Sequence, residues 1–404
     1  MSDGPSLGDG QTVGNGLDVS HGQIVSHGQI ASDDLHRRRT QAALDHEQAD
    51  RIPLTLGGPS CSLHRDAHRN LLAHLGLTPE REAPVFDRIL QIVEPDPQIL
   101  RRFDVDLRWL LPHEAEAAWS EDRQSCVDEF GRGFVAGGGF FNQTSSPLRE
   151  GSMEELRAYR FPDLSPARVT GLRDKAERLH AEGYGLGVDG PWGIYEIASS
   201  LRGTEDYLVD LALDPDYARS LAERVLEEHH IPFYTLLLAE TTPYAQVVVV
   251  SDDLGSQQGS IFSPQTFRSI FKPLLRRLVD HIHSLADVRV YMHSDGAIYD
   301  LIPDLIEAGV EGLNPVQYTA RGMDLDRLKR EFGRDLGFFG GTLENELLSF
   351  NTTDAIRGKV RENVATLAPG GGFLFASVHN IGPEVPPANV TALFEAALEF
   401  GQYG

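Results

Sequence analysis

Two segments of the chain each bring an imidazole to the end of an apolar run. In VRVYMHSDG, residues 288–296, His293 and Asp295 stand two positions apart. Because side chains alternate along a strand, both are expected on the same side of its end. A second imidazole, His379, follows the apolar run GFLFAS near the end of the chain. These residues could bind a metal ion, transfer protons, or only close loops.

Two imidazoles and one carboxylate suit a catalytic zinc ion, or a harder divalent ion, with at least one open position. An open position could polarise a substrate oxygen or nitrogen, or lower the pKa of a bound hydroxyl. Without metal, the same set would be a hydrogen-bonded His–Asp pair that fixes one tautomer and moves a proton near neutral pH. We name His293, Asp295 and His379 as the catalytic residues in either case, and as the metal ligands in the first.

Other side chains could bind a substrate near these residues. Asp252 and Asp253 follow the run AQVVVVS and could also complete a metal shell. Glutamines can hydrogen-bond a substrate, and aromatic rings can line a pocket, although buried rings more often belong to a core. The further candidates are Trp192, Tyr195, Gln258 and Gln317.

Short apolar runs alternate with helical patterns along most of the chain. This alternation predicts a parallel sheet with right-handed crossovers, and the unbroken valines suggest burial on both faces. One helical pattern, 263–286, has Ser263 as N-cap, Pro264 in its first turn and Pro273 as an expected bend. The expected strands are 185–190, 245–253, 288–296, 311–316, 336–341 and 372–380.

The polar residues that follow these strands distinguish between two architectures. An open dinucleotide-binding sheet is disfavoured, because no G-x-G-x-x-G follows a first strand. In a closed (β/α)8 barrel, the carboxyl ends of all strands meet at one rim, where active sites lie. We therefore predict a single α/β domain, a (β/α)8 TIM barrel over residues 34–404.

Two regions depart from the barrel pattern. Residues 1–33 are rich in Gly, Ser and Asp and contain SHGQI twice, which predicts a disordered tail. Residues 112–165 contain Gly-rich and aromatic stretches that suggest a hairpin-like excursion. That excursion could cover the barrel mouth as a lid or be an ordinary surface elaboration.

The overall composition limits the classes of binding partner that the protein can have. The chain has 404 residues, and its formal charge of −24 argues against nucleic-acid or anionic-membrane binding. It has no apolar run of membrane-spanning length and no visible signal peptide. Two cysteines, Cys61 and Cys126, are too few for a disulfide framework. We expect a cytoplasmic protein with a small-molecule substrate, and a homodimer through the outer helices is one expectation.

Several segments together resemble the uroporphyrinogen decarboxylase superfamily, which also contains corrinoid-linked methyltransferases. The resemblance covers the chain from about 45 to 400 and implies a (β/α)8 barrel with its site at the carboxyl-end rim. In DVDLRW, Arg108 resembles a family arginine and could anchor an anionic substrate, or pair with Asp104 or Asp106. The matching segments include DRIPLTLGG, FDVDLRWLLP, SLRGTEDYLVDLALDPDYA, HSDGAIYDLIPDLIEAGVEGLNPVQ and LAPGGGFLFASVHNIGPEVPPANV.

The chain also departs from two family patterns. The decarboxylases bind substrate carboxylates with an Arg-rich loop like MRQAGRYLPEY, whereas the corresponding region of this chain has Arg65 and Arg69 but lacks that motif. The thiol methyltransferases hold zinc with an HSCG loop and a later Cys, where this chain has HSDG and Val378 beside His379. A polycarboxylate wants several fixed guanidinium groups, so haem biosynthesis is disfavoured.

The resemblance therefore implies an enzyme, most consistently a methyltransferase-type activity on a methylated oxygen or nitrogen compound. Its cofactors would be zinc or another divalent ion, and a corrinoid carried by a partner protein. The alternative is a metal-free decarboxylase or lyase acting on a carboxylated, tetrapyrrole-like or smaller acid. A third reading, a non-catalytic binding protein, is disfavoured by the polar rim.

Overall fold

The computed structural model describes residue 1 and residues 34–403, apart from 59 and 80. The tail predicted for 1–33 lies, except for Met1, outside the described residues. Within the described part, no helix combines the length and apolar character needed to cross a bilayer.

Seven parallel strands form one curved sheet in the order β14-β13-β12-β11-β10-β9-β4. Each strand pairs with the strand before it in the barrel, as expected for successive βα units. The strands are β4 (Leu107–Leu110), β9 (Gly185–Asp189), β10 (Val247–Ser251), β11 (Arg289–His293), β12 (Gly312–Asn314), β13 (Gly337–Phe339) and β14 (Phe373–Leu374).

The segment 53–55 closes this sheet into a barrel. Leu54 bridges Phe375, just past β14, and Thr55 bridges Leu107 of β4, both in parallel orientation. The Thr55 N–H donates to the Phe375 carbonyl over 2.9 Å. This segment takes the place of an eighth strand beside the seven others, which confirms the predicted (β/α)8 barrel.

The valine run in β10 is uninterrupted because both faces of the strand are buried. Val247 and Val249 belong to the core inside the barrel, and Val248 and Val250 to the core between sheet and helices. The surrounding helices are α3 (Arg65–Leu75), α4 (Pro97–Arg102), α6 (Leu172–Ala181), α7 (Ile194–Arg202), α8 (Thr204–Leu213), α9 (Pro215–Val225), α10 (Ile231–Thr241), α12 (Lys272–Leu285), α13 (Ile302–Glu307), α14 (Leu325–Phe332), α15 (Asn345–Phe350), α16 (Thr353–Leu367) and α17 (Pro387–Phe400).

Two π-helical turns interrupt the helical layer, and in each case a proline follows after one further residue. The helix predicted over 263–286 is divided into α11 (Pro264–Thr266), η3 (Phe267–Phe271) and α12, which contains Pro273. Likewise η2 (Leu226–His230) joins α9 to α10, which contains Pro232. Proline has no N–H and its ring collides with the carbonyl four residues earlier, so a wider turn accommodates it.

The helix α2 (Leu35–Leu44) closes the amino end of the barrel. Ala43 and Leu44 belong to the interior core together with residues such as Leu107 and Tyr291. Tyr291 crosses that interior close to Gly312 and Gly337, where an added Cβ would lie 2.4 and 1.9 Å from its side chain. Small residues on the neighbouring strands therefore make room for one large ring.

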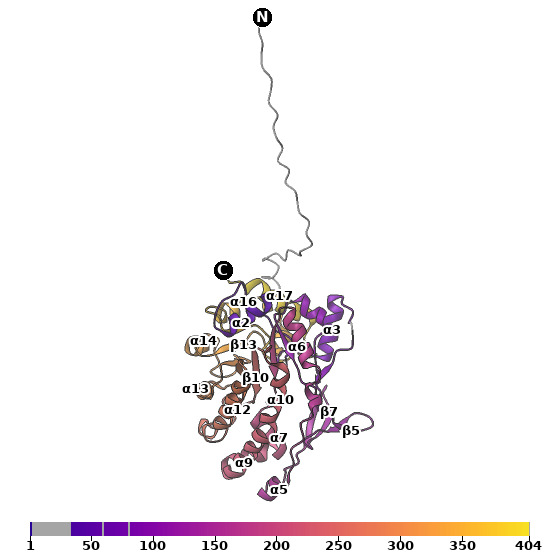
Figure 1. Ribbon diagram of the computed structural model, residues 1–404, viewed down its shortest axis with the longest axis vertical. Coiled ribbons are helices and arrows are strands. Elements are labelled where there is room, and N and C mark those ends of the chain that lie inside the picture. Colours follow the sequence, from indigo (N-terminus) through magenta and orange to yellow (C-terminus); the bar gives the residue numbers. More distant parts are fainter. Residues whose placement is uncertain (2–33, 59, 80, 404) are drawn as a thin grey trace.

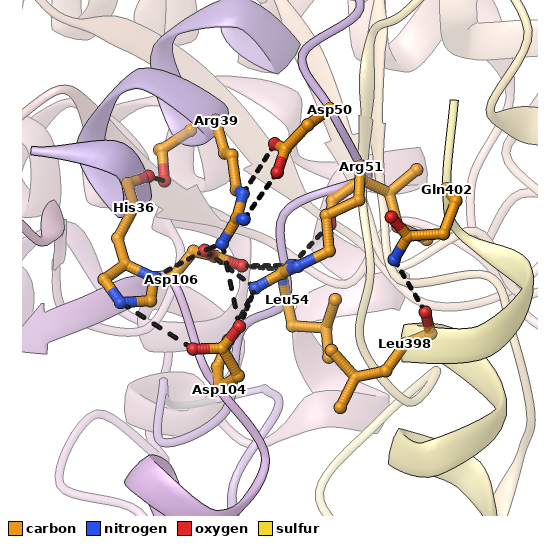
Figure 2. A network of polar contacts seen from close by, with 11 residues as sticks. His36, Arg39, Asp50, Arg51, Leu54, Asp104, Asp106, Leu398 and Gln402 are labelled. Carbon is orange, nitrogen blue, oxygen red and sulfur yellow. Dashed lines mark hydrogen bonds and ion pairs between the residues drawn. The ribbon is translucent and has the colours of Figure 1, made fainter. Parts of the chain in front are cut away.

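A buried charge network fixes α2 to the barrel at this end (Figure 2). The fully buried Asp106 carboxylate accepts hydrogen bonds from Arg51 at 2.6 Å, Arg39 at 3.2 Å and His36 Nδ1 at 2.7 Å. It also accepts the Leu54 N–H at 2.8 Å. The network thus joins the helix, the closing segment and the start of β4, which indicates a structural role.

The excursion after β4 is an antiparallel sheet of four strands. Figure 1 shows it at the end of the molecule opposite the C-terminus and α2. Its strands are β5 (Ala118–Trp119), β6 (Ser125–Val127), β7 (Gly133–Gly137) and β8 (Phe140–Ser145), followed by α5 (Met153–Ala158). A smaller sheet contains β1 (Leu63–His64), β2 (Val85–Asp87) and β3 (Ile92–Val93).

Candidate active site

A cavity of about 560 Å³ lies at the carboxyl ends of the barrel strands. Its inner end includes Asp189, Asp253, His293 and His379, which follow or end different strands. Phe130, from the excursion, contributes to its wall. The excursion therefore covers part of the barrel mouth, and the strand ends meet inside a sheltered space.

The three predicted catalytic residues come together in space. His293, Asp295 and His379 each offer one ligand atom, and these atoms all lie within 4.8 Å of one another. The His379 Nε2 is 3.8 Å from the nearer Asp295 oxygen, and the two imidazole centroids are 5.9 Å apart. Both histidines line the cavity, and Asp295 lies beside them. This donor set fits a divalent ion with an open position.

The tautomer of His293 is fixed by an amide. Its Nδ1 lies 2.8 Å from the Asn314 Oδ1, which can only accept, so Nδ1 carries the proton. The same oxygen accepts a hydrogen bond from the Ser60 hydroxyl at 2.7 Å. The Nε2 lone pair is therefore left free on the side of Asp253, whose Oδ1 is 3.7 Å away. Such an outer partner commonly orients a metal-binding imidazole.

The two imidazoles differ in their affinity for a proton. Burial lowers the pKa of His293, but the Asp295 and Asp253 carboxylates outweigh it, so the pKa is raised. Burial lowers the pKa of His379, and the positive charge of His293 adds to that, so its pKa stays below the ordinary value. Of the pair, His293 is the one that holds a proton more readily.

Two further carboxyl groups make the inner end of the cavity unusual. Burial raises the pKa of Asp189 to about 7. Burial, together with the Asp253 carboxylate, raises the pKa of Glu196 to about 7 as well. Near neutral pH these groups exchange protons easily, a property that often marks functional sites.

The arginines that line the cavity are all engaged with acids. None of the described lining residues is a lysine, and each lining arginine has a carboxylate partner within 3.2 Å. The cavity therefore offers no uncommitted cation within the described residues. The pairs are Arg88–Glu114 (3.2 Å), Arg132–Asp128 (2.7 Å) and Arg168–Glu129 (3.2 Å).

Two of the predicted substrate-binding residues line the cavity. Asp253 lies beside His293 and accepts the Asp295 N–H at 2.9 Å. Trp192 is 39% exposed and forms part of the cavity wall. Gln317 is close by without lining it: its amide oxygen accepts the Gly296 N–H at 2.7 Å, which fixes the loop after β11.

The other predicted substrate-binding residues lie elsewhere. Asp252 is buried and accepts the N–H groups of Tyr195 and Glu196 at 2.9 and 3.0 Å, so it caps α7. The Tyr195 ring is buried in the core between sheet and helices, and the Gln258 side chain is exposed. None of the three lines the cavity among the described residues.

Arg108 also lies outside the cavity lining, for a reason visible in its strand. Its neighbours Leu107 and Trp109 belong to the interior core, so alternation turns Arg108 outward to the helices. There its guanidinium stacks on the Tyr184 ring, 4.2 Å from the centroid. The ion pair expected with Asp104 or Asp106 does not form either, because Arg51 and Arg39 bind those carboxylates.

The cavity contains residues that were not predicted as site residues. Asp189 is the last residue of β9, so the pattern of polar strand ends could have found it. Glu196 and His229 lie in helices, Arg132 lies in the excursion, Arg88 in the loop after β2, and Arg168 in a short 3-10 helix, Pro166–Val169. Their sequence positions carry no signal, because only the tertiary structure brings helices and excursion to the rim.

Comparison with known proteins supports the architecture. The sequence profile of a family described as "Uroporphyrinogen decarboxylase (URO-D)" matches residues 152–400. A search of curated proteins found no match. A methyltransferase from Methanosarcina mazei has a similar structure, with a TM-score of 0.63 and 17% identity over 90% of this chain and 98% of that one. A GH113 β-1,4-mannanase matches with a TM-score of 0.40 and 10% identity, over 87% and 99% of the two chains.

Proposed function

The chain belongs to the uroporphyrinogen decarboxylase family. Within that family, we propose that it is a methyltransferase-type enzyme. Its substrate is a methylated oxygen or nitrogen compound, and a corrinoid protein is its partner. The observation that carries the proposal is the convergence of His293, Asp295 and His379 at the inner end of a cavity. The fold shared with the Methanosarcina methyltransferase is consistent with this proposal.

The residues divide the work as their geometry suggests. Methyl transfer from oxygen or nitrogen requires the leaving heteroatom to be made electron-poor. His293, Asp295 and His379 would hold a divalent ion, which as a Lewis acid would withdraw electrons from that heteroatom. Asn314 keeps the His293 Nε2 lone pair available, and the Glu196 carboxyl can supply a proton to the departing group.

The absence of free cations in the described cavity lining weighs against the decarboxylase alternative. A tetrapyrrole with many carboxylates needs several guanidinium or ammonium groups, whereas the lining arginines are bound to acids. Asp189, Glu196 and Asp253 would repel additional carboxylates at the inner end. A neutral or cationic substrate suits these surroundings better than a polyanion.

Metal analysis of purified protein tests the first part of the proposal. We expect about one divalent ion per chain, and loss of that ion in His293→Ala and in His379→Ala. The variant His74→Ala is the control, because His74 is exposed in α3. Retention of the full metal content in both site variants would show that these residues are not ligands.

Methyl transfer from methylcobalamin to an added phenol or amine, the reverse of the proposed reaction, tests the second part and is followed through the absorption spectrum of the cob(I)alamin that is released. We expect turnover by the unmodified protein and by His74→Ala, and a loss of about 100-fold or more in His379→Ala. Carbon dioxide release from uroporphyrinogen, with no use of methylcobalamin, would favour the decarboxylase instead.

A further inference from the structure

One histidine in the cavity wall has no hydrogen-bond partner among the described residues. His229 is 1% exposed and lines the cavity from the turn η2 between α9 and α10. Neither Nδ1 nor Nε2 forms a hydrogen bond within the part of the chain that the structure describes. An unpaired buried polar atom costs about 1–3 kcal/mol, so two in one side chain require an explanation.

The neighbouring histidine has hydrogen-bond partners in the same turn. His230 is equally buried, yet its Nδ1 lies 3.2 Å from the Val225 carbonyl and its Nε2 lies 3.0 Å from the Trp192 carbonyl, and a neutral imidazole can donate to one of these two acceptors. The π-helical turn itself is accounted for by Pro232. The unusual feature is therefore the bonding of His229, and not the helix geometry.

His229 is held in its neutral form. Burial lowers its pKa well below the ordinary value, and the positive charges of Arg168 and Arg132 add to the effect. A neutral imidazole offers one N–H donor and one acceptor nitrogen. It therefore suits an uncharged polar group of a ligand better than a carboxylate.

Aromatic rings surround this imidazole. Phe130, from the excursion, meets it edge-on with centroids 5.0 Å apart, and Phe233 of α10 lies 5.8 Å away. Both rings also line the cavity, as does Trp192. This part of the cavity thus has flat apolar walls and one directional polar group, a combination typical of small-molecule sites.

We propose that His229 recognises the substrate by a hydrogen bond to a neutral hydroxyl group on an aromatic ring that packs against Phe130 and Phe233. The methyl-bearing heteroatom of that ring compound would then face the inner end, toward His293. The inference rests on the proposed function only in taking this cavity as the substrate site. Both nitrogens are covered in this conformation, so binding requires the imidazole to turn about its side-chain torsions toward the cavity that it lines.

The test is a binding measurement that needs no turnover. Isothermal titration calorimetry compares 2-methoxyphenol with methoxybenzene, which lacks the hydroxyl, on the full chain and on His229→Phe. We expect His229→Phe to weaken 2-methoxyphenol binding about three- to tenfold and to leave methoxybenzene unchanged. His229→Gln, which keeps a donor and an acceptor, should restore part of the difference.

Equal effects on both probes would overturn the hydrogen bond, and failure of both to bind would overturn the aromatic substrate class. Thermal unfolding supplies a second readout: His229→Phe should keep or raise the melting temperature, whereas His230→Phe should lower it. A large loss of stability in His229→Phe would indicate a structural imidazole and contradict the proposal. Binding without methyl transfer would refute the proposed function and leave this inference intact.

Discussion

The carboxyl group of Asp189 lies buried at the end of β9, beside the cavity, and its pKa is raised to about 7. Among the described residues, its Oδ1 accepts only the Gly190 N–H, at 2.9 Å. An aspartate in an unfolded chain titrates near 3.9. The folded state therefore binds more protons between about pH 4 and 7, and stability falls as the pH rises through that range.

We predict that Asp189→Asn stabilises the protein more at high pH than at low pH. The amide keeps the hydrogen-bond acceptor and cannot ionise, so the benefit grows up to about pH 7 and then stays constant. The gain in unfolding free energy should be about 2.6 kcal/mol larger at pH 8 than at pH 5. Chemical denaturation at both pH values measures it, and a gain that does not change with pH would contradict the raised pKa.

At this scale, the sequence was informative where a polar residue ends an apolar run. His293, Asp295 and His379 were singled out on that basis, and the structure brings them within 4.8 Å. Their chemical roles stay predictions. Arg108 was misplaced because LRWL does not reveal which alternate residues face the barrel interior. The sequence could not have indicated His229. Its proposed role is inferred from the lack of hydrogen bonds to its ring nitrogens among the described residues, which only the three-dimensional structure shows.

Among the elements, the charge network that joins α2 to the barrel has a clear energetic role. Asp106 faces Arg39 and Arg51, and all three residues are buried. Removing one member of a buried ionic network leaves the others unpaired in a medium of low dielectric constant. The network is thus a condition for closing the amino end of the barrel.

Asp106→Asn should lower the free energy of unfolding by about 3–5 kcal/mol. The matched control is Glu395→Gln, which removes the partially exposed pair with Arg102 at 2.5 Å. That change should cost no more than about 1 kcal/mol. Denaturant titration measures the loss of unfolding free energy in both variants. Equal losses would mean that burial does not increase the contribution of the network to stability.

The structural elements differ in how well they could be predicted from the sequence. The central strands were predictable because both faces are buried, as the valines of β10 show. The closing segment 53–55 was expected as an extended entry, but its pairing with both β4 and β14 depends on barrel closure. The excursion was expected to form hairpins, yet its contribution of Phe130 to the cavity could not be read from Gly-rich sequence.

In the molecule as a whole, the stabilising charge network and the candidate active site lie at opposite ends of the barrel axis. Asp106 precedes β4 and Asp189 ends β9, and the pairing of Leu107 with Gly185 places them at opposite ends of adjacent parallel strands. With about 3.3 Å per residue and five residues between their levels, the two groups lie roughly 17 Å apart along the strands. Figure 1 shows the same separation, with α2 near the C-terminus and the excursion at the other end.

Sites at this separation, with no shared partner, should contribute independently. The double variant Asp106→Asn/Asp189→Asn should therefore show the sum of the single effects within about 0.5 kcal/mol at pH 8. Its metal content should match that of the unmodified protein, because neither residue belongs to the proposed ligand set. A larger coupling energy from the four denaturation curves would mean that strain passes along the barrel interior, and that the closed amino end helps to set the geometry of the cavity.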